Sequence, residues 1–283
     1  MGKKKYNTLT PEEKQVLIHK GTEAPFKGLY TNYKEKGLYI CKQCNEPLFR
    51  SEYKFSSSCG WPSFDDEIDG AIAYHPDSDG RRTEIVCAKC GAHMGHVFEG
   101  EGFTKKNRRH CVNSISMNFI AQEKMETAIF AGGCFWGVQH FFLNLEGVYT
   151  SRVGYTGGKK DNPTYKEVCR TNTGHYEAIE ITFNPQVISY EELAKLFFEI
   201  HDPTQANGQG PDIGNQYLSA VFYLSEKQKT TIENLIALLR QKGFPVVTDL
   251  IKASKFWEAE DYHQFYYEKK GSTPYCHIYE KKF

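Results

Sequence analysis

Residues 127–145 of this chain, TAIFAGGCFWGVQHFFLNL, place two kinds of secondary structure next to each other. The first seven residues are mostly apolar and end in two glycines, which is typical of a buried strand followed by a tight turn. The next twelve, which begin at Cys134, are mostly apolar over a length that suits a helix. A strand followed at once by a helix indicates a layered structure that contains both element types.

The same alternation continues toward the C-terminus. The predicted elements there are a strand at 176–183, a helix opened by Ser189 with Glu192, a strand at 216–224, a helix opened by Ser225 with Gln228 that ends at Gly243, and a helix at 257–268. Strands that alternate with helices favour an α/β or α+β sandwich for the second half of the chain.

The first half has a different composition. Thr10, Pro11 and Glu13 form a capping box that predicts a helix ending at Gly21. Residues 37–120 are rich in glycine, polar turns and short alternating runs, which predict a small all-β unit. The run CVNSISMNFI at 111–120 is predicted to be one strand. Extended back to residue 109, its alternation places every second residue on one face: Arg109, Cys111, Asn113, Ile115, Met117 and Phe119. The polar segment 121–125 is predicted to be a linker between two unlike folds.

Length and charge limit the function classes. At roughly 150 residues per domain, 283 residues predict about two domains. The 35 basic and 35 acidic residues balance, which argues against a nucleic acid or an anionic membrane as the partner. No run of 18 apolar residues is present, and the N-terminal residues lack the apolar core of a signal peptide. We therefore expect a cytoplasmic protein, in which nine cysteines serve as ligands or catalysts rather than as disulfide staples.

Four of these cysteines form two CxxC pairs, Cys41 with Cys44 and Cys87 with Cys90. A two-residue gap lets both thiolates of a pair reach one ion, and four thiolates suit tetrahedral zinc. The alternative is a pair of redox dithiols, but a redox CxxC usually opens a helix in a βαβ unit. We predict a structural zinc site, because four ligands leave no vacancy for substrate or water.

Cys134 is a candidate nucleophile. It follows two glycines and opens a helix, so backbone amides and the helix dipole are expected to lower its pKa. The adjacent Phe135 and Trp136 are either ordinary core residues or the wall of a pocket for a small apolar group. Glu177 is in phase with the apolar residues of its predicted strand, where burial would raise the pKa of its carboxyl group and keep it protonated as a general acid. The alternative for Glu177 is a strand-end residue in solvent.

The first half has its own candidates. Cys111 lies in the same strand phase as Arg109, whose guanidinium would stabilise a thiolate, and as Asn113, whose amide could hold an oxygen atom. His93 and His96 follow the second CxxC pair and stay free for acid chemistry if four cysteines saturate the zinc, although paired histidines of this kind are more often structural. Cys59 lies in a predicted loop that contains Gly60 and Pro62, where its thiol could move to meet a reaction partner. The alternative is a loop cysteine without a role.

These motifs resemble those of two families. Residues 9–120 resemble methionine sulfoxide reductase B through the two CxxC pairs and the segments CGWPSF (59–64), AHMGHVF (92–98) and RRHCVNS (108–114). Residues 126–276 resemble methionine sulfoxide reductase A through GGCFWG (132–137), VGYTGG (153–158), NPTY (162–165), GHYEAIE (174–180), HDPT (201–204) and AEDYHQ (259–264). The two enzymes act on opposite epimers of methionine sulfoxide. The resemblance implies a strand-rich, two-sheet domain at 1–120 and a two-layer α/β sandwich at 126–283.

The resemblance also implies roles in the A-like half. Cys134 attacks the sulfoxide sulfur of the S epimer, and Glu177 protonates the oxygen. Tyr165 and Tyr217 hold this oxygen, and Phe135 with Trp136 encloses the S-methyl group. Cys276 recycles the oxidised Cys134 through a disulfide that thioredoxin reduces. The resemblance gives Asp212 a role in shaping the site, although the segment GPDIGNQY (210–217) lacks the asparagine that usually precedes this aspartate.

In the B-like half the resemblance implies that Cys111 attacks the R epimer. The residues that polarise and protonate its oxygen are His93, His96 and Asn113, while Arg109 supports the thiolate. Trp61 encloses the methyl group, and Cys59 recycles Cys111. Oxidised proteins and peptides are the implied substrates.

Cys169 matches no catalytic position and is expected to have a packing role. Only HIYEKKF follows Cys276, so no third cysteine extends the relay. Two other functions compete with this interpretation. A zinc-ribbon interaction module fused to an α/β partner would explain the CxxC pairs but not GGCFWG or RRHCVNS. A disulfide oxidoreductase or thiol chaperone would explain paired cysteines but not a carboxyl group on an apolar face.

Overall fold

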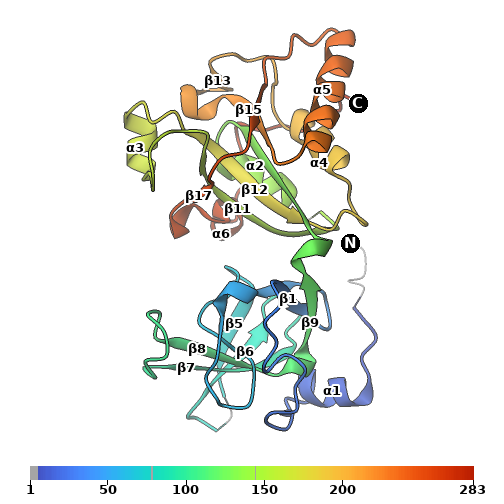
Figure 1. The fold of residues 1–283 in the computed structure, drawn as a ribbon, viewed down its shortest axis with the longest axis vertical. Coiled ribbons are helices and arrows are strands. Elements are labelled where there is room, and N and C mark those ends of the chain that lie inside the picture. Colours follow the sequence, from blue (N-terminus) through green and yellow to red (C-terminus); the bar gives the residue numbers. More distant parts are fainter. Residues whose placement is uncertain (1–5, 78, 144) are drawn as a thin grey trace. The chain divides into compact units, whose positions relative to one another are not determined.

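The computed structural model describes residues 6–77, 79–143 and 145–283. The chain divides into two compact units, with the boundary between Lys124 and Met125 (Figure 1). The predicted two-domain architecture is therefore confirmed, and each unit has a hydrophobic core of its own. Within the described ranges, no helix combines the length and apolar character that a bilayer crossing requires.

The first unit consists mainly of short antiparallel strands. Its elements are α1 (Pro11–Leu17), β1 (Gly37–Cys41), β2 (Pro47–Arg50), η1 (Ser51–Tyr53), β3 (Lys54–Phe55), β4 (Ser63–Phe64), β5 (Ile72–Pro76), β6 (Thr83–Cys87), β7 (His93–Glu99), β8 (Arg108–Val112), η2 (Ser114–Ser116), β9 (Met117–Ala121) and η3 (Gln122–Lys124). One sheet has the order β2-β1-β9 and the other β3-β4-β8-β7-β6-β5. Aromatic residues such as Tyr39, Phe49 and Phe64 fill the core, and none of these three side chains is exposed.

Helix α1 begins as the sequence predicts, but it ends earlier. The Thr10 hydroxyl accepts from the Glu13 amide, and the Glu13 carboxylate accepts from the Thr10 amide, so the capping box is present. The helix stops at Leu17 rather than at Gly21. Val16 and Leu17 are its last buried residues, whereas half of the Ile18 side chain is exposed, so extending the helix would bury no further apolar surface.

The prediction of a single strand through residues 111–120 is wrong. The 3₁₀ turn η2 interrupts the run and sends β8 and β9 into different sheets. The Glu23 carboxylate accepts from the amide of Ile115, and the Ser116 hydroxyl donates to the carbonyl of His93. These side-chain bonds replace ladder bonds and explain the turn, so the residues after Asn113 do not share the face of Cys111.

The second unit is built on one six-stranded sheet. Its elements are β10 (Glu126–Gly132), α2 (Phe135–Phe142), β11 (Val148–Thr156), α3 (Tyr165–Arg170), β12 (Tyr176–Phe183), α4 (Tyr190–Glu199), β13 (Gly208–Gln209), β14 (Asp212–Ile213), η4 (Asn215–Tyr217), β15 (Ser219–Tyr223), α5 (Glu226–Gln241), β16 (Asp249–Lys252), β17 (Trp257–Glu258), η5 (Asp261–His263) and α6 (Tyr266–Lys270). The sheet order is β16-β15-β10-β12-β11-β17, and only the β15–β16 pair is parallel. Position 144 of the predicted helix at 134–145 lies outside the described residues.

Helices α4 and α5 cover one face of this sheet (Figure 1). Phe130 of β10 stacks on Phe197 of α4 with ring centroids 4.9 Å apart, and Ile232 and Leu239 of α5 join the same core. The capping residues predicted for both helices are in place at Ser189 and Ser225. The helices therefore hold β10 and β12, which carry the site described below, in the centre of the sheet.

The prediction of one helix at 257–268 is wrong. Trp257 and Glu258 extend as strand β17, which pairs with β11, and Asp261–His263 form a 3₁₀ turn. Phe265 has φ of 55°, a left-handed conformation that ends any preceding helix, so only Tyr266–Lys270 are helical. Edge-strand pairing therefore overrides the local helical pattern. The elements β11, α3 and β16 were not predicted from the sequence.

Candidate active sites and metal centre

The two CxxC pairs meet in space. The sulfur atoms of Cys41 and Cys90 are 3.6 Å apart, and so are those of Cys44 and Cys87. All four sulfur atoms lie within 4.8 Å of one another. For zinc–sulfur bonds of about 2.3 Å, tetrahedral geometry places ligand sulfurs roughly 3.8 Å apart, so the four thiols fit one zinc ion.

The turns after the two pairs have matching geometry. Asn45 and Gly91 follow the second cysteine of each pair and have φ of 60° and 74°. Their amides donate to the carbonyls of Cys41 and Cys87 at 2.9 and 2.8 Å. Asparagine and glycine are the residues that adopt this left-handed conformation most easily. The backbone thus turns both cysteines of each pair toward one point.

A cavity of about 110 Å³ in the first unit contains Cys111. Strand register places Cys111 between Ser63 of β4 and His96 of β7. Trp61, His96, Cys111 and Asn113 line the cavity, together with residues that the sequence analysis did not select: Thr22, Arg82, Gly95 and Phe98. The sulfur of Cys59 lies 3.7 Å from that of Cys111. The structure therefore brings the Cys111 thiol, an imidazole and an indole to one small cavity, with the Cys59 thiol next to Cys111.

The pKa values of the Cys111 and Cys59 thiols are shifted in opposite directions. Burial and the nearby Cys59 raise the pKa of Cys111 to about 12, although Arg109 opposes this rise. Burial also acts on Cys59, but hydrogen bonds from Ser57 and Ser63 outweigh it and lower the pKa of Cys59. Cys111 is therefore held as a thiol rather than as the preformed thiolate that the sequence analysis expected beside Arg109.

The main partners of the Arg109 guanidinium are Glu101 and Phe98 rather than Cys111. Its guanidinium makes a bidentate pair with Glu101 at 2.7 and 2.9 Å and lies over the ring of Phe98, 4.5 Å from the centroid. Bidentate pairing fixes the orientation of a guanidinium. Arg109 therefore acts on the pKa of Cys111 with an oriented guanidinium whose charge is partly neutralised by Glu101.

The two histidines have separate partners. His93 is buried, and its Nδ1 lies 2.7 Å from a Glu84 carboxylate oxygen, while His96 contacts the carboxylate of Asp77 through Nε2. The ring centroids are 5.6 Å apart. His96 lines the cavity of Cys111, and His93 is not among the described residues that line it.

Glu23 positions two residues of this cavity, and no local sequence pattern marks it. Its backbone carbonyl accepts from the indole of Trp61 at 3.0 Å, and its amide donates to the side-chain oxygen of Asn113 at 3.1 Å. Asn113 in turn donates to the carbonyl of Met94. Both polar atoms of the Asn113 side chain are therefore fixed by the protein itself.

The second unit contains another pair of thiols. Cys134 is the N-cap of α2 and is 8% exposed. Its sulfur, the sulfur of Cys276 and a carboxylate oxygen of Asp212 all lie within 4.8 Å of one another. All nine cysteines belong to the described residues and are free thiols. Residues 142 positions apart in the chain therefore form one sulfur cluster.

Glu177 is buried beside this cluster. It is 1% exposed, as its strand phase predicts, and its Oε2 accepts from the Phe135 amide at 3.2 Å. Its Oε1 has no hydrogen-bond partner among the described residues. Burial, followed by the nearby Cys134, raises the pKa of Glu177 well above its ordinary value. The shift favours the protonated form of this carboxyl group, which lies near Cys134.

The expectation of a lowered pKa for Cys134 is wrong. A hydrogen bond with Cys276, and then burial, raise this pKa, and the Trp136 amide opposes them only in part. The Phe135 amide donates its hydrogen bond to Glu177 instead of to the sulfur of Cys134. A second thiol at close range outweighs the short helix because two neighbouring sulfurs do not both ionise readily.

Residues 126–283 match the family model of peptide methionine sulfoxide reductase, and residues 9–121 match that of the SelR domain. The chain belongs to the peptide methionine sulfoxide reductase family. It resembles the peptide methionine sulfoxide reductases MsrA of Sulfolobus acidocaldarius (50% identity, 54% of this chain, 88% of the relative) and Acidobacterium capsulatum (51%, 54% and 100%). The solved structure of reduced Mxr1 from Saccharomyces cerevisiae covers 56% of this chain and 94% of its own, with 35% identity and a TM-score of 0.53.

This reductase therefore combines two sulfoxide-reducing domains in one chain, each with its own thiol pair. Its aromatic residues next to Cys134 form a packed wall. The indole of Trp136 stacks on Tyr266 with centroids 3.7 Å apart and planes at 5°, and its Nε1 donates to His263 at 3.0 Å. Phe135 packs on Tyr155 at 5.8 Å. Neither alternative for this aromatic pair holds alone, because Phe135 is buried and Trp136 is partly exposed.

Tyr165 and Tyr217 of the reductase lie near Glu177. Burial, and then the nearness of Glu177, raise the pKa of both phenols, so they remain hydrogen-bond donors. Cys169, which was expected only to pack, lies close enough to both phenols for them to influence its pKa. Its position at the edge of the site was not predictable, because α3 was not recognised and no family role marks this cysteine.

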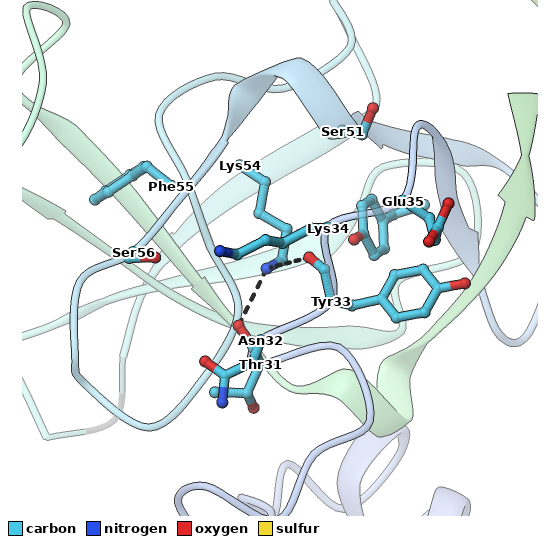
Figure 2. A pocket seen from close by; sticks show the side chains of 10 residues that line it. Thr31, Asn32, Tyr33, Lys34, Glu35, Ser51, Lys54, Phe55 and Ser56 are labelled. Carbon is cyan, nitrogen blue, oxygen red and sulfur yellow. Dashed lines mark hydrogen bonds between the residues drawn. The ribbon is translucent and has the colours of Figure 1, made fainter.

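A further cavity of about 230 Å³ lies in the first unit of the reductase (Figure 2). Lys54 extends into it and donates to the carbonyls of Thr31 and Tyr33 at 3.1 and 3.0 Å. Its described lining contains hydroxyls, aromatic rings and two lysines, but no cysteine. This cavity is therefore separate from the sulfur chemistry.

Proposed function

We propose that the first unit reduces the R epimer of methionine sulfoxide and the second unit the S epimer, in oxidised peptides and proteins. The observation that carries the proposal is that each unit places two thiols side by side next to a proton donor and an indole ring. Two stereochemically opposite substrates require two differently shaped pockets, which accounts for two unlike folds in one chain.

In the second unit Cys134 attacks the sulfoxide sulfur, and the S–O oxygen takes its proton from Glu177. The products are methionine and a sulfenic acid on Cys134; the Cys134 thiol proton replaces the one that Glu177 donated. Tyr165 and Tyr217 hold the oxygen through their hydroxyls, and Phe135 with Trp136 encloses the methyl group. Asp212 shapes the space around the two sulfurs. Burial raises the pKa of Glu177, which supports its role as the acid.

In the first unit Cys111 is the nucleophile. His96 is the acid that reaches the substrate oxygen, because it lines the cavity and lies opposite Cys111 in the sheet. His93 and Asn113 hold the surrounding geometry, and Arg109 lowers the cost of forming a Cys111 thiolate. Trp61, anchored through Glu23, encloses the methyl group.

Recycling follows the same chemistry in both units. Cys59 attacks oxidised Cys111, and Cys276 attacks oxidised Cys134; each step forms a disulfide and releases water. Thioredoxin then reduces the disulfide through thiol exchange. The supporting observation is the short distance within each pair in the reduced protein.

A structural zinc ion would be held by the four cysteines of the CxxC pairs and would crosslink β1, β6 and the turns that follow them. These cysteines are Cys41, Cys44, Cys87 and Cys90. We assign the first unit, 1–120, to the mostly-β two-sheet class and the second, 126–283, to the two-layer α/β sandwiches. The residues between them, 121–125, include the last residue of β9 and the 3₁₀ turn η3, and they join the two units in the chain. The balanced charge and the odd number of nine cysteines support a cytoplasmic enzyme without a nucleic-acid or membrane partner.

The test separates the epimers. Each pure epimer of methionine sulfoxide is incubated with wild type, Cys111→Ser and Cys134→Ser, and the remaining substrate is measured by chiral chromatography. Cys111→Ser should lose the R activity alone and Cys134→Ser the S activity alone. Cys169→Ser, which removes a cysteine of the second unit outside both pairs, is the control for Cys111→Ser and should keep the R activity. Loss of the opposite epimer in either variant would overturn the assignment.

A further inference from the structure

His277 occupies a special position beside the recycling cysteine of the second unit. Its ring is 3% exposed and lies between two polar partners. Nε2 is 2.7 Å from the carbonyl oxygen of Gly132, and Nδ1 is 3.0 Å from the sulfur of Cys276. No role in the sulfur chemistry described above uses this imidazole.

The two contacts fix the protonation of the ring. A carbonyl oxygen only accepts hydrogen bonds, so Nε2 must carry the hydrogen that is donated to Gly132. Burial lowers the pKa of His277, so the ring is neutral and Nδ1 is left with a lone pair. The thiol of Cys276 therefore donates its hydrogen to Nδ1. A thiol that donates to an oriented imidazole is the arrangement that activates cysteine nucleophiles in general.

The chain makes room for this ring with a glycine. A Cβ atom on Gly137 of α2 would lie 2.2 Å from Nδ1 and 2.9 Å from Cε1 of His277. Gly137 has no unusual backbone conformation, so steric access is the physical reason for a glycine inside the helix. The last glycine of the GGCFWG segment thus leaves the space in which His277 meets Cys276.

We infer that His277 is the general base of the recycling step, which takes the thiol proton of Cys276 as this sulfur attacks oxidised Cys134. The inference rests on the proposed function of this thiol pair. The Cys276–Cys134 S–S bond forms, the S–O bond of the sulfenic acid breaks, and the departing hydroxide takes the proton from His277 to become water. The sulfenic sulfur is reduced and the thiol sulfur is oxidised, so no further reductant is needed.

The test measures two steps separately in one turnover. The full chain, in a Cys111→Ser background, is mixed with one equivalent of the S epimer. Methionine release reports attack by Cys134, and mass spectrometry of the digested chain reports the Cys134–Cys276 disulfide. His277→Gln keeps a donor for the Gly132 carbonyl but lacks the lone pair at Nδ1. We expect unchanged methionine release and disulfide formation slowed about 100-fold or more, with sulfenic acid accumulating for capture by dimedone.

Two further variants separate a chemical role from a structural one. Gly137→Ala changes no titratable group but displaces the ring, and it should slow the same step. His140→Gln, at a partly exposed histidine on the same helix, is the matched control and should leave both steps unchanged. Both variants are checked for a wild-type melting temperature before the comparison.

The pH profile gives a readout that a structural role would not move. The charged and titratable groups around His277 and Cys276 are Cys134, Asp212, His201, Tyr267 and Tyr275. Wild-type disulfide formation should be independent of pH above about 6.5, since His277 is already neutral there. In His277→Gln the rate should increase with pH, because hydroxide must then remove the thiol proton.

Disulfide formation at the wild-type rate in His277→Gln would overturn the inference, and so would an equal slowing of methionine release. If the wild-type chain itself releases methionine but forms no Cys134–Cys276 disulfide, the recycling part of the proposed function fails instead.

Discussion

The sulfur atoms of Cys59 and Cys111 lie 3.7 Å apart in the reduced protein, on a loop and a strand that the β4–β8 pairing holds together. A disulfide requires about 2 Å between its sulfurs. The two thiols thus need to approach by roughly another 2 Å, which side-chain rotation and a small shift of the loop supply. If Cys59 recycles Cys111 as proposed, the first unit is arranged for this step before any substrate binds.

Cys59→Ser should therefore separate turnover from cycling in the first unit. One equivalent of methionine per chain should be released from the R epimer at the wild-type rate, whereas steady-state activity with thioredoxin should fall by at least 100-fold. Product release in a single-turnover experiment measures the first quantity. A variant that still cycles with thioredoxin would exclude Cys59 as the recycling thiol, and Cys169→Ser provides the matched cysteine control.

Removing the metal should damage only the first unit. Structural zinc contributes roughly 10 kcal/mol or more to small domains that depend on it. Cys44→Ser should abolish the bound zinc, measured by elemental analysis, and the R activity, while the S activity stays within twofold of wild type. A wild-type protein that contains much less than one zinc per chain, yet reduces the R epimer, would contradict the structural zinc site.

Glu177 should make the second unit less stable as pH rises. A carboxyl group with a raised folded-state pKa binds its proton more tightly in the folded than in the unfolded protein. Stability is then greatest below the unfolded value near 4.5 and falls as pH rises toward the folded pKa. Glu177→Gln cannot ionise, so its melting temperature relative to wild type should increase from pH 5 to pH 8.

The same variant should lose S activity by about 100-fold or more, because the amide cannot donate the proton that the oxygen requires. Calorimetry and the single-turnover assay measure the two effects on one protein sample. A constant difference in melting temperature between pH 5 and pH 8 would show that Glu177 does not carry the raised pKa. Glu180→Gln, in the same strand but paired with Arg152, is a suitable control.

Glu23→Gln should weaken the first unit alone. Its carboxylate accepts from the amides of Ser114 and Ile115, and hydrogen bonds to a charged group contribute about 1.5–3 kcal/mol. The substitution should lower the free energy of unfolding by that amount and reduce R activity, since the turn that follows Asn113 loosens. Denaturation monitored by tryptophan fluorescence measures the first effect, and Glu12→Gln on the exposed side of α1 is the control.

Much of the fold and site was predictable where a local pattern carries the information. The alternation around Glu177 placed it on the buried face, and the spacing of Cys41, Cys44, Cys87 and Cys90 predicted a four-sulfur cluster. Both features depend on periodicity or on short spacing. The capping residues of α1, α4 and α5 were predictable for the same reason.

The failures have a common physical cause in contacts between distant residues. The run 111–120 breaks because its amides bind Glu23, some 90 residues earlier in the chain. The pKa of Cys134 rises because Cys276 arrives from the other end of the domain. Residues 257–258 become a strand because β11 offers an edge for pairing. Local propensity does not depend on such distant partners. Neither these elements nor the position of Cys169 could therefore be predicted correctly from the sequence.

The most direct test of two independent reductases in one chain is disulfide mapping after a single turnover. The reduced protein is given one equivalent of one epimer, alkylated, digested and analysed by mass spectrometry. The R epimer should produce only the Cys59–Cys111 disulfide and the S epimer only the Cys134–Cys276 disulfide. Formation of both disulfides from one pure epimer, or of a disulfide that joins the two units, would contradict the account.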